Sequence, residues 1–197
     1  MWDERYAGES FFYGTDPNDF LREHAPGIRT GGRVLCLGEG EGRNAVFLAG
    51  LGLSVVALDQ SAVALRKALR LAESRGTSIT TLQADLESYS IEPGCWDAIV
   101  SIWCHLPTAL RAKVHAQVVA GLKPGGVFLL EAYRPEQLQF GTGGPKAVDM
   151  LPTLAQLREE LSGLELVYAA ALERDVHEGQ GHSGLSAVVQ VLARRGR

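Results

Sequence analysis

The feature that most constrains the fold is a regular alternation of short apolar runs with helical patterns. In one helical segment, for example, Leu65, Leu69 and Ala72 recur on one face. Strands that alternate with helices form βαβ units, with parallel strands and right-handed crossovers. We therefore predict an α/β fold with strands at residues 33–37, 53–58, 79–84, 98–103 and 127–131, and helices at 44–51, 62–74 and 108–122.

The end of the chain departs from this alternation. A further helix is expected at 153–161, and two strands are expected at 164–173 and 185–193, separated by a loop at 174–184. Because no helix fits between these two strands, they must pair antiparallel. The prediction is a mixed sheet in which a C-terminal hairpin contributes one antiparallel strand. Ligands of such sheets bind outside the carboxyl ends of the parallel strands.

Composition excludes several classes of protein. The 197 residues carry a net charge of −4, which argues against a nucleic-acid binder. The three cysteines, Cys36, Cys95 and Cys104, have no metal-ligand spacing and are expected to be reduced thiols. No stretch approaches the roughly 20 apolar residues of a membrane helix, and the N-terminus lacks an apolar secretory core. We expect one domain, residues 1–197, in a soluble cytoplasmic protein.

A glycine-rich loop follows the first strand, in the sequence VLCLGEGEGRNAVFLAGLG. The dinucleotide pattern G-x-G-x-x-G would need glycine where Arg43 stands, and no Gly-Lys-Ser/Thr follows as in a P-loop. Glu39 and Glu41 would repel a pyrophosphate at the start of the next helix. S-adenosylmethionine has no phosphate and carries a sulfonium and an ammonium group, so we predict that this cofactor binds here.

Two more acids follow the next two strands. Asp59 ends the second strand, 21 residues after Gly38, where it is suited to hold the hydroxyl groups of a ribose. Asp85 follows the third strand and is suited to the adenine amino group. Three acidic positions at three successive strand ends make a stronger pattern than any one of them.

Five segments, in order, carry a family resemblance: VLCLGEGEGRNAVFLA, VVALDQS, TTLQADLESY, WDAIVSIWCHLP and LKPGGVFLLEAY. They resemble the motifs of class I S-adenosylmethionine-dependent methyltransferases over residues 31–133. The start MWDERY…FFYGTDPNDFL, the segment QFGTGGPKAVDMLP and the terminal hairpin are similar to the small tellurite-resistance-type branch. One departure is Cys36, since many class I members have an acid at that position; Glu39 is a candidate replacement.

The resemblance implies a three-layer, Rossmann-like methyltransferase fold with a mixed seven-stranded sheet. It implies that residues 1–28 cover the cofactor and that residues 134–151 form a loop over the active site. The cofactor-binding residues expected from the motifs and the resemblance are Trp2, Arg5, Tyr6, Tyr13, Gly38, Glu39, Gly40, Gly42, Arg43, Asn44, Asp59, Gln60, Ser61, Asp85, Leu86, Ser101 and Trp103.

Residues around the methyl acceptor are expected on the same face. A base is needed only when the acceptor arrives protonated. His105 directly follows the fourth strand, and Arg134 opens the long loop after the fifth. His177 and His182 lie in the expected loop 174–184, where they suit anion binding or a proton relay, or else an exposed hairpin tip. We predict these four as catalytic residues, and we predict no metal site.

The most direct interpretation is a methyltransferase that moves a methyl group from S-adenosylmethionine to a small molecule by in-line displacement. The branch resemblance suggests a thiol or a metalloid oxyanion such as tellurite as the acceptor. The alternatives are a nicotinamide-dependent oxidoreductase, from the sheet alone, and a cofactor-binding protein without catalysis. The expected partners are the small-molecule acceptor alone, with no nucleic acid or membrane, and the sequence leaves monomer and homodimer open.

Overall fold

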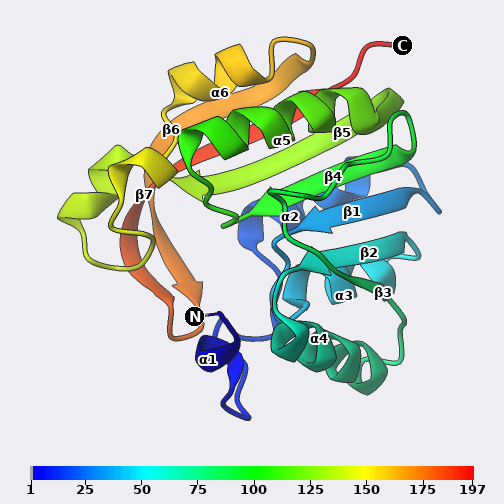
Figure 1. The fold of residues 1–197 in the computed structure, drawn as a ribbon, viewed down its shortest axis with the longest axis vertical. Coiled ribbons are helices and arrows are strands. Elements are labelled where there is room, and N and C mark those ends of the chain that lie inside the picture. The colour runs from blue at the N-terminus through cyan, green and yellow to red at the C-terminus, as the bar shows by residue number, and fades with distance from the viewer. Residues whose placement is uncertain (1) are drawn as a thin grey trace.

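A computed structural model describes residues 2–197, which build one sheet with the strand order β3-β2-β1-β4-β5-β7-β6 (Figure 1). The pairs β3–β2, β2–β1, β1–β4 and β4–β5 are parallel, and β7 is antiparallel to both β5 and β6. β6 therefore runs parallel to β5. The strands are β1 Arg33–Leu37, β2 Ser54–Asp59, β3 Thr80–Gln83, β4 Trp96–Ile102, β5 Leu122–Tyr133, β6 Glu165–Glu178 and β7 His182–Arg194.

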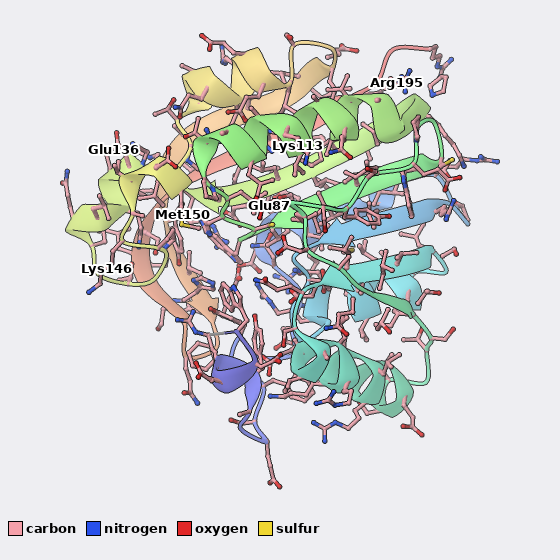
Figure 2. The ribbon with its side chains drawn as sticks, in the orientation of Figure 1. Glu87, Lys113, Glu136, Lys146, Met150 and Arg195 are labelled. Carbon is pink, nitrogen blue, oxygen red and sulfur yellow. The ribbon has the colours of Figure 1, made fainter. Side chains whose placement is uncertain are left out.

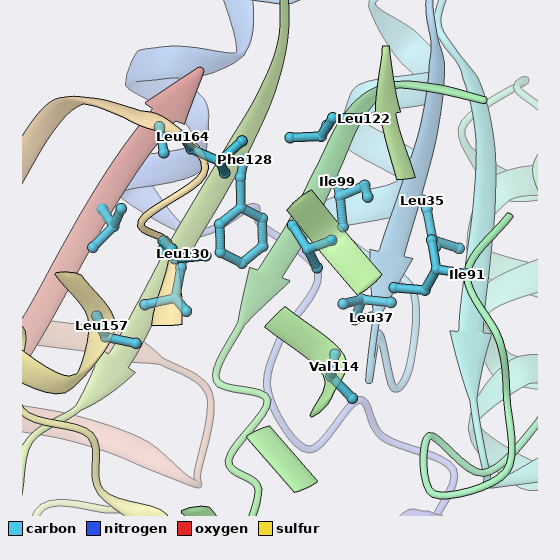
Figure 3. Packing of buried hydrophobic residues seen from close by; sticks show 14 of the residues in the cluster. Leu35, Leu37, Ile91, Ile99, Val114, Leu122, Phe128, Leu130, Leu157 and Leu164 are labelled. Atoms are coloured by element: carbon cyan, nitrogen blue, oxygen red, sulfur yellow. The ribbon is translucent and has the colours of Figure 1, made fainter. Parts of the chain in front are cut away.

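Helices cover both faces of the sheet, as three layers require (Figure 1). The chain forms α1 Trp2–Tyr6, α2 Asp19–His24, α3 Arg43–Gly50, α4 Ala62–Ser74, α5 Thr108–Gly121 and α6 Leu154–Glu160, with short 3-10 turns η1 Ala25–Gly27, η2 Pro135–Gln139 and η3 Val148–Met150. One buried cluster joins α5 and α6 to the sheet, and Figure 3 shows Leu35, Ile99 and Phe128 of neighbouring strands within it. A second cluster packs Leu21 of α2 and Leu48 of α3 against the opposite face.

The expected α/β architecture and the mixed seven-stranded sheet are confirmed, but the loop expected at 174–184 is wrong. β6 continues to Glu178 and β7 begins at His182, so only residues 179–181 connect them. The added residues are polar, yet Arg174, Val176 and Glu178 point inward while Asp175 and His177 are exposed. The sequence prediction looked for apolar residues on the inner face and therefore missed these parts of the strands. Charged residues can lie on that face because their charges are paired inside the protein.

The hairpin tip, residues 179–181, lies beside the N-terminal segment (Figure 1). The amide of Gln180 donates to the carbonyl of Phe12 at 2.8 Å. A Cβ added to Gly181 would lie 2.2 Å from the ring of Tyr13. Segments from the two ends of the chain therefore meet at the carboxyl ends of the parallel strands, where they close one side of the candidate site.

None of the helices in residues 2–197 has the length and apolar character needed to cross a membrane.

Candidate functional site

A cavity of about 590 Å³ opens at the carboxyl ends of β1, β2 and β4. Its wall combines residues from the N-terminal segment, the glycine loop, the ends of β2, β3 and β4, the loop after β5 and the hairpin tip. The lining includes Trp2, Arg5, Tyr6, Phe12, Tyr13, Gly38, Glu39, Glu41, Arg43, Asn44, Leu58, Asp59, Gln60, Ala84, Asp85, Leu86, Ile102, Trp103, Cys104, His105, Leu106, Gly143, Gly144, Pro145, Met150, Gly181 and His182.

Glycines at 38, 40 and 42 let the loop after β1 turn tightly and approach its neighbours. All three have positive φ values, which other residues rarely adopt. A Cβ on Gly38 would lie 2.8 Å from Sγ of Cys104. A Cβ on Gly42 would lie 2.5 Å from Cβ of Ala68 on α4, so the loop sits directly on that helix. Only glycine fits this path.

Glu39 caps the first turn of α3. Its carboxylate accepts the backbone N–H groups of Asn44, at 3.0 Å, and Ala45, at 2.8 Å. The N-cap residue, Gly42, has no side chain for this purpose, so the upstream acid takes over the free donors. Burial raises the pKa of Glu39 to about 7. Cys36, at the position where an acid is common, is fully buried and does not line the cavity.

Glu41 makes an ion pair inside the protein. Its partner is Lys67 of α4, and both side chains are buried. The second oxygen of Glu41 accepts the backbone N–H groups of Phe12, at 2.7 Å, and Tyr13, at 3.3 Å. The sequence argument that Glu41 would repel a pyrophosphate is therefore weakened, because Lys67 neutralises its charge.

Asp59 ties the glycine loop to the end of β2. Its carboxylate accepts the N–H of Gly40 and the N–H of Ser61, each at 2.8 Å, and burial raises its pKa. The hydroxyl of Ser61 in turn bonds Asp3 of α1. At the next strand end, Asp85 is exposed and accepts the N–H of Glu87 at 2.9 Å. The three expected acids thus line one side of the cavity, and each is fixed by backbone donors.

His105 is held by main-chain groups on both sides of its ring. Nε2 accepts the N–H of Tyr133 at 2.9 Å, and Nδ1 lies 3.0 Å from the carbonyl of Trp103, to which it donates. Burial lowers the pKa of His105 to about 4. The ring is therefore neutral at pH 7 with both nitrogens occupied, which leaves no free lone pair with which His105 could accept a proton.

His182 belongs to a cluster of packed rings, the acceptor end, made of Phe12, Tyr13, Trp103, His105, Tyr133 and His182. Its ring stacks on Tyr13, with centroids 4.7 Å apart, and on Trp103, at 4.9 Å. Nδ1 lies 2.7 Å from the hydroxyl of Tyr133. Burial lowers the pKa of His182 to about 3, so its ring is neutral at pH 7. Among the residues that the structure describes, Nε2 has no protein partner.

A buried ionic network lies behind the acceptor end. Glu178 accepts bonds from Arg43, from Nε1 of Trp103 at 2.5 Å and from Asn18 at 2.8 Å. Arg174 forms a two-armed bond with the fully buried Glu131, both distances being 2.8 Å. Trp103 has φ of +56°, a strained value for a large side chain, and Glu178 is well placed to hold it there. Two acids and two arginines make this network neutral.

Fifteen of the predicted residues line the cavity and six do not. Gly40, Gly42, Ser61 and Ser101 lie behind the wall and support it. Arg134 instead pairs with Glu136 at 2.7 Å, and His177 is exposed on the outward face of β6. The structure therefore brings neither Arg134 nor His177 into the site. In residues 2–197, no group of three His, Cys, Asp or Glu side chains could hold a metal ion.

Several lining residues were not predicted individually, among them Phe12, Cys104, Met150 and Gly181. Phe12 and Met150 lie in segments that were expected to cover the site, whereas Cys104 resembles an ordinary core residue. The expected loop 134–151 does reach the cavity, through Gly143, Gly144, Pro145 and Met150. Figure 2 shows Glu136, Lys146 and Met150 on this part of the chain, with Lys146 extending outward. Gln137 fastens the loop, because it bonds Thr142 at 2.9 Å and accepts the N–H of Ala187 at 2.8 Å.

Comparisons with known proteins identify a related domain and related folds. Residues 34–126 match the family model of a methyltransferase domain. A search of curated protein sequences found no match. A structure from work on the conversion of a disulfide bond into a thioacetal group during echinomycin biosynthesis is similar, with a TM-score of 0.75 at 19% identity, over 99% of this chain and 91% of that one.

Two further structures share the fold. TehB from Haemophilus influenzae has a TM-score of 0.74 at 19% identity, over 98% of this chain but only 65% of TehB. An S-adenosylmethionine-dependent methyltransferase from Methanosarcina mazei has a TM-score of 0.66 at 18% identity, over 92% and 99% of the two chains. The fold and the matched domain define a methyltransferase. The enzyme uses S-adenosyl-L-methionine as its cofactor.

The residues present fit this cofactor. The glycine loop runs so close to Cys104 and Tyr6 of the cavity wall that a Cβ at Gly38 or Gly40 would clash with them. Glu39, Asp59 and Asp85 supply negative charge to the same wall. Ala84, Leu86 and Leu106 provide apolar surface beside these acids. An acidic wall suits a sulfonium and an ammonium group and disfavours a pyrophosphate. The nicotinamide alternative is therefore not supported.

Proposed function

We propose that the enzyme methylates a small acceptor that binds as an anion, namely a thiolate or a metalloid oxyanion such as tellurite. The observation that carries this proposal is that, within residues 2–197, the acceptor end offers hydrogen-bond donors but no effective base. His105 has both nitrogens occupied, and the pKa of His182, about 3, is too low for a good proton acceptor near pH 7. An acceptor that is already deprotonated needs no base.

Three groups on the cavity wall can hold an anion. Arg5 donates to the hydroxyl of Tyr13 at 3.0 Å, and both residues line the cavity. The Tyr13 hydroxyl, which accepts from Arg5, keeps its own hydrogen to donate. We assign to His182 the tautomer in which Tyr133 donates to Nδ1, so that Nε2 carries a hydrogen toward the cavity. Bonds from such donors to an anion are stronger than bonds between neutral groups.

The remaining groups of the acceptor end orient the acceptor and exclude water from the site. Phe12, Tyr13, Trp103 and His182 exclude water through their ring faces, and Glu178 fixes the Trp103 ring by its indole N–H. The bound cofactor supplies an electrophilic methyl group on a positively charged sulfur. An acceptor held in line with that methyl group gains the large advantage of pre-set orientation. The fold similarity to TehB and the branch resemblance support this acceptor class.

A panel assay tests the proposal. Purified enzyme with S-adenosyl-L-methionine is offered thiols, tellurite, selenite, small carboxylates and amines, and S-adenosyl-L-homocysteine is quantified. We expect turnover with at least one thiol or metalloid oxyanion, and none with amines that need a base. Turnover confined to amines or neutral alcohols would overturn the proposed acceptor class, while the cofactor assignment would stand.

A further inference from the structure

The N-terminal cover, residues 2–14, is one wall of the cofactor cavity, through Trp2, Arg5, Tyr6, Phe12 and Tyr13. Its helix α1 has only five residues, and much of the cover is exposed. Such a short segment needs bonds from elsewhere to hold its shape. The structure shows which groups supply them.

Lys67 of α4 is the main attachment point of this cover. Its ammonium group donates to the carbonyl oxygens of Tyr6 at 3.4 Å, Gly8 at 2.9 Å and Ser10 at 2.6 Å. It also lies 5.3 Å from the ring centroid of Phe11. Lys67 is only 2% exposed, which is unusual for a lysine on a helix. A buried ammonium group is costly unless it is paired.

Glu41 supplies the pairing charge and joins the cover to the glycine loop. It binds Lys67 through one oxygen and accepts the amides of Phe12 and Tyr13 through the other. The same loop is pressed onto α4 next to Lys67, where Gly42 contacts Ala68. One ion pair therefore fastens three parts of the cofactor cavity together: the cover, the loop and α4.

We propose that Lys67 and Glu41 are positioning residues that set cofactor affinity by holding the N-terminal cover closed. Lys67 does not line the cavity, so it acts through the cover. If only a fraction of the molecules have the cover closed, the apparent dissociation constant of the cofactor equals its intrinsic value divided by that fraction. Saturating cofactor restores the closed state, so kcat changes far less than the affinity does.

The test compares Lys67→Met with Lys123→Met. Lys123 is also ion-paired, to Asp97 at 2.7 Å, but it lies at the start of β5, at the far end of the sheet from the cavity. Calorimetry with S-adenosyl-L-homocysteine should show that K67M weakens binding at least tenfold, while K123M binds within twofold of the unaltered enzyme. Hydrogen exchange should accelerate in residues 2–14 of K67M and remain unchanged in the strands.

Glu41→Gln is the second variant, for the case in which K67M does not fold. It keeps the volume of the side chain and loses the charge, and it should also weaken binding and accelerate exchange in the cover. The proposal is overturned when a folded K67M or E41Q binds S-adenosyl-L-homocysteine within twofold of the unaltered enzyme, or when K123M loses as much affinity. None of these results depends on the identity of the methyl acceptor.

Discussion

The two ends of the cavity differ in how their polar groups are held. At the cofactor end, Glu39 and Asp59 are fixed by backbone N–H groups and remain in the cavity wall as acids. At the acceptor end, His105 and His182 are neutral rings packed among aromatic residues. The first end therefore carries negative charge that suits a cation, and we propose that the second orients an acceptor that is already deprotonated.

The strongest effect of a single substitution is expected at Asp59. Asp59→Ala removes the acceptor for the N–H groups of Gly40 and Ser61 and one negative charge from the cofactor wall. We expect about a 100-fold loss of affinity for S-adenosyl-L-homocysteine, because losing a charge-assisted hydrogen bond costs about 1.5–3 kcal/mol. Isothermal titration calorimetry measures this affinity.

Asp97→Ala is the matched control, because Asp97 is similarly buried and accepts the N–H of Arg33 at 2.9 Å at the opposite end of the sheet. It should lower Tm and leave cofactor affinity unchanged. Equal losses of affinity in the two variants would show that Asp59 acts only through stability.

At the acceptor end, His182→Phe should lower kcat/KM for the acceptor by roughly 10- to 100-fold, the effect of one lost hydrogen bond to an anion. The stacking on Tyr13 and Trp103 is kept, so the affinity for S-adenosyl-L-homocysteine should change little. His177→Phe alters an exposed histidine on the same hairpin and should stay within twofold. Steady-state kinetics on a responsive acceptor checks both, and a normal rate in H182F would mean that His182 does not hold the acceptor.

The pKa of Glu39, about 7, predicts a pH dependence of cofactor binding. Raising the pH from 6 to 8 ionises Glu39, and a cationic cofactor binds the ionised form better. Affinity should therefore increase by about tenfold over this range, as expected for a group with this pKa that releases its proton on binding.

In Glu39→Gln the cofactor affinity should not vary with pH between 6 and 8, and it should equal the affinity of the unaltered enzyme at low pH. Calorimetry in buffers of different ionisation enthalpy should detect proton release near pH 6 in the unaltered enzyme. Affinity that falls with rising pH would contradict the assigned sign.

The weakest effect is expected at Arg134. The sequence placed it among the catalytic residues, but its guanidinium pairs with Glu136 and lies outside the cavity wall. Arg134→Gln should keep kcat/KM within twofold, with a modest change of Tm. A tenfold loss for anionic acceptors alone would mean that Arg134 steers them after all, and the two ends would then differ less than we infer.

The parts of the molecule that sequence reasoning predicted share a cause. Strand and helix periods, the glycine loop and the acids at strand ends are local patterns, and parallel strands bring their carboxyl ends together automatically. For that reason Gly38, Asp59 and Asp85 could be assigned to one site from the sequence alone. The extent of β6 and β7 was missed because inward polar residues such as Arg174 and Glu178 resemble a solvated loop.

The unpredicted features depend on contacts between distant segments. Lys67 is one of several charged residues on α4, and the sequence does not distinguish it from its exposed neighbours Arg66 and Arg70. Only the packing of residues 2–14 on that helix buries it beside Glu41. Likewise, the occupied nitrogens of His105 follow from the backbone of Trp103 and Tyr133, which no spacing rule reveals.

The absence of a base at the acceptor end is tested most directly by a pH–rate profile measured with a series of thiols of different pKa, or with analogous metalloid acids. For an acceptor that binds as an anion at a site without a base, kcat/KM should rise with the ionised fraction of each acceptor, at saturating cofactor. The inflection should then move with the pKa of the acceptor. An inflection that stays at one pH for every acceptor would reveal a titrating base on the enzyme and contradict the proposed mechanism.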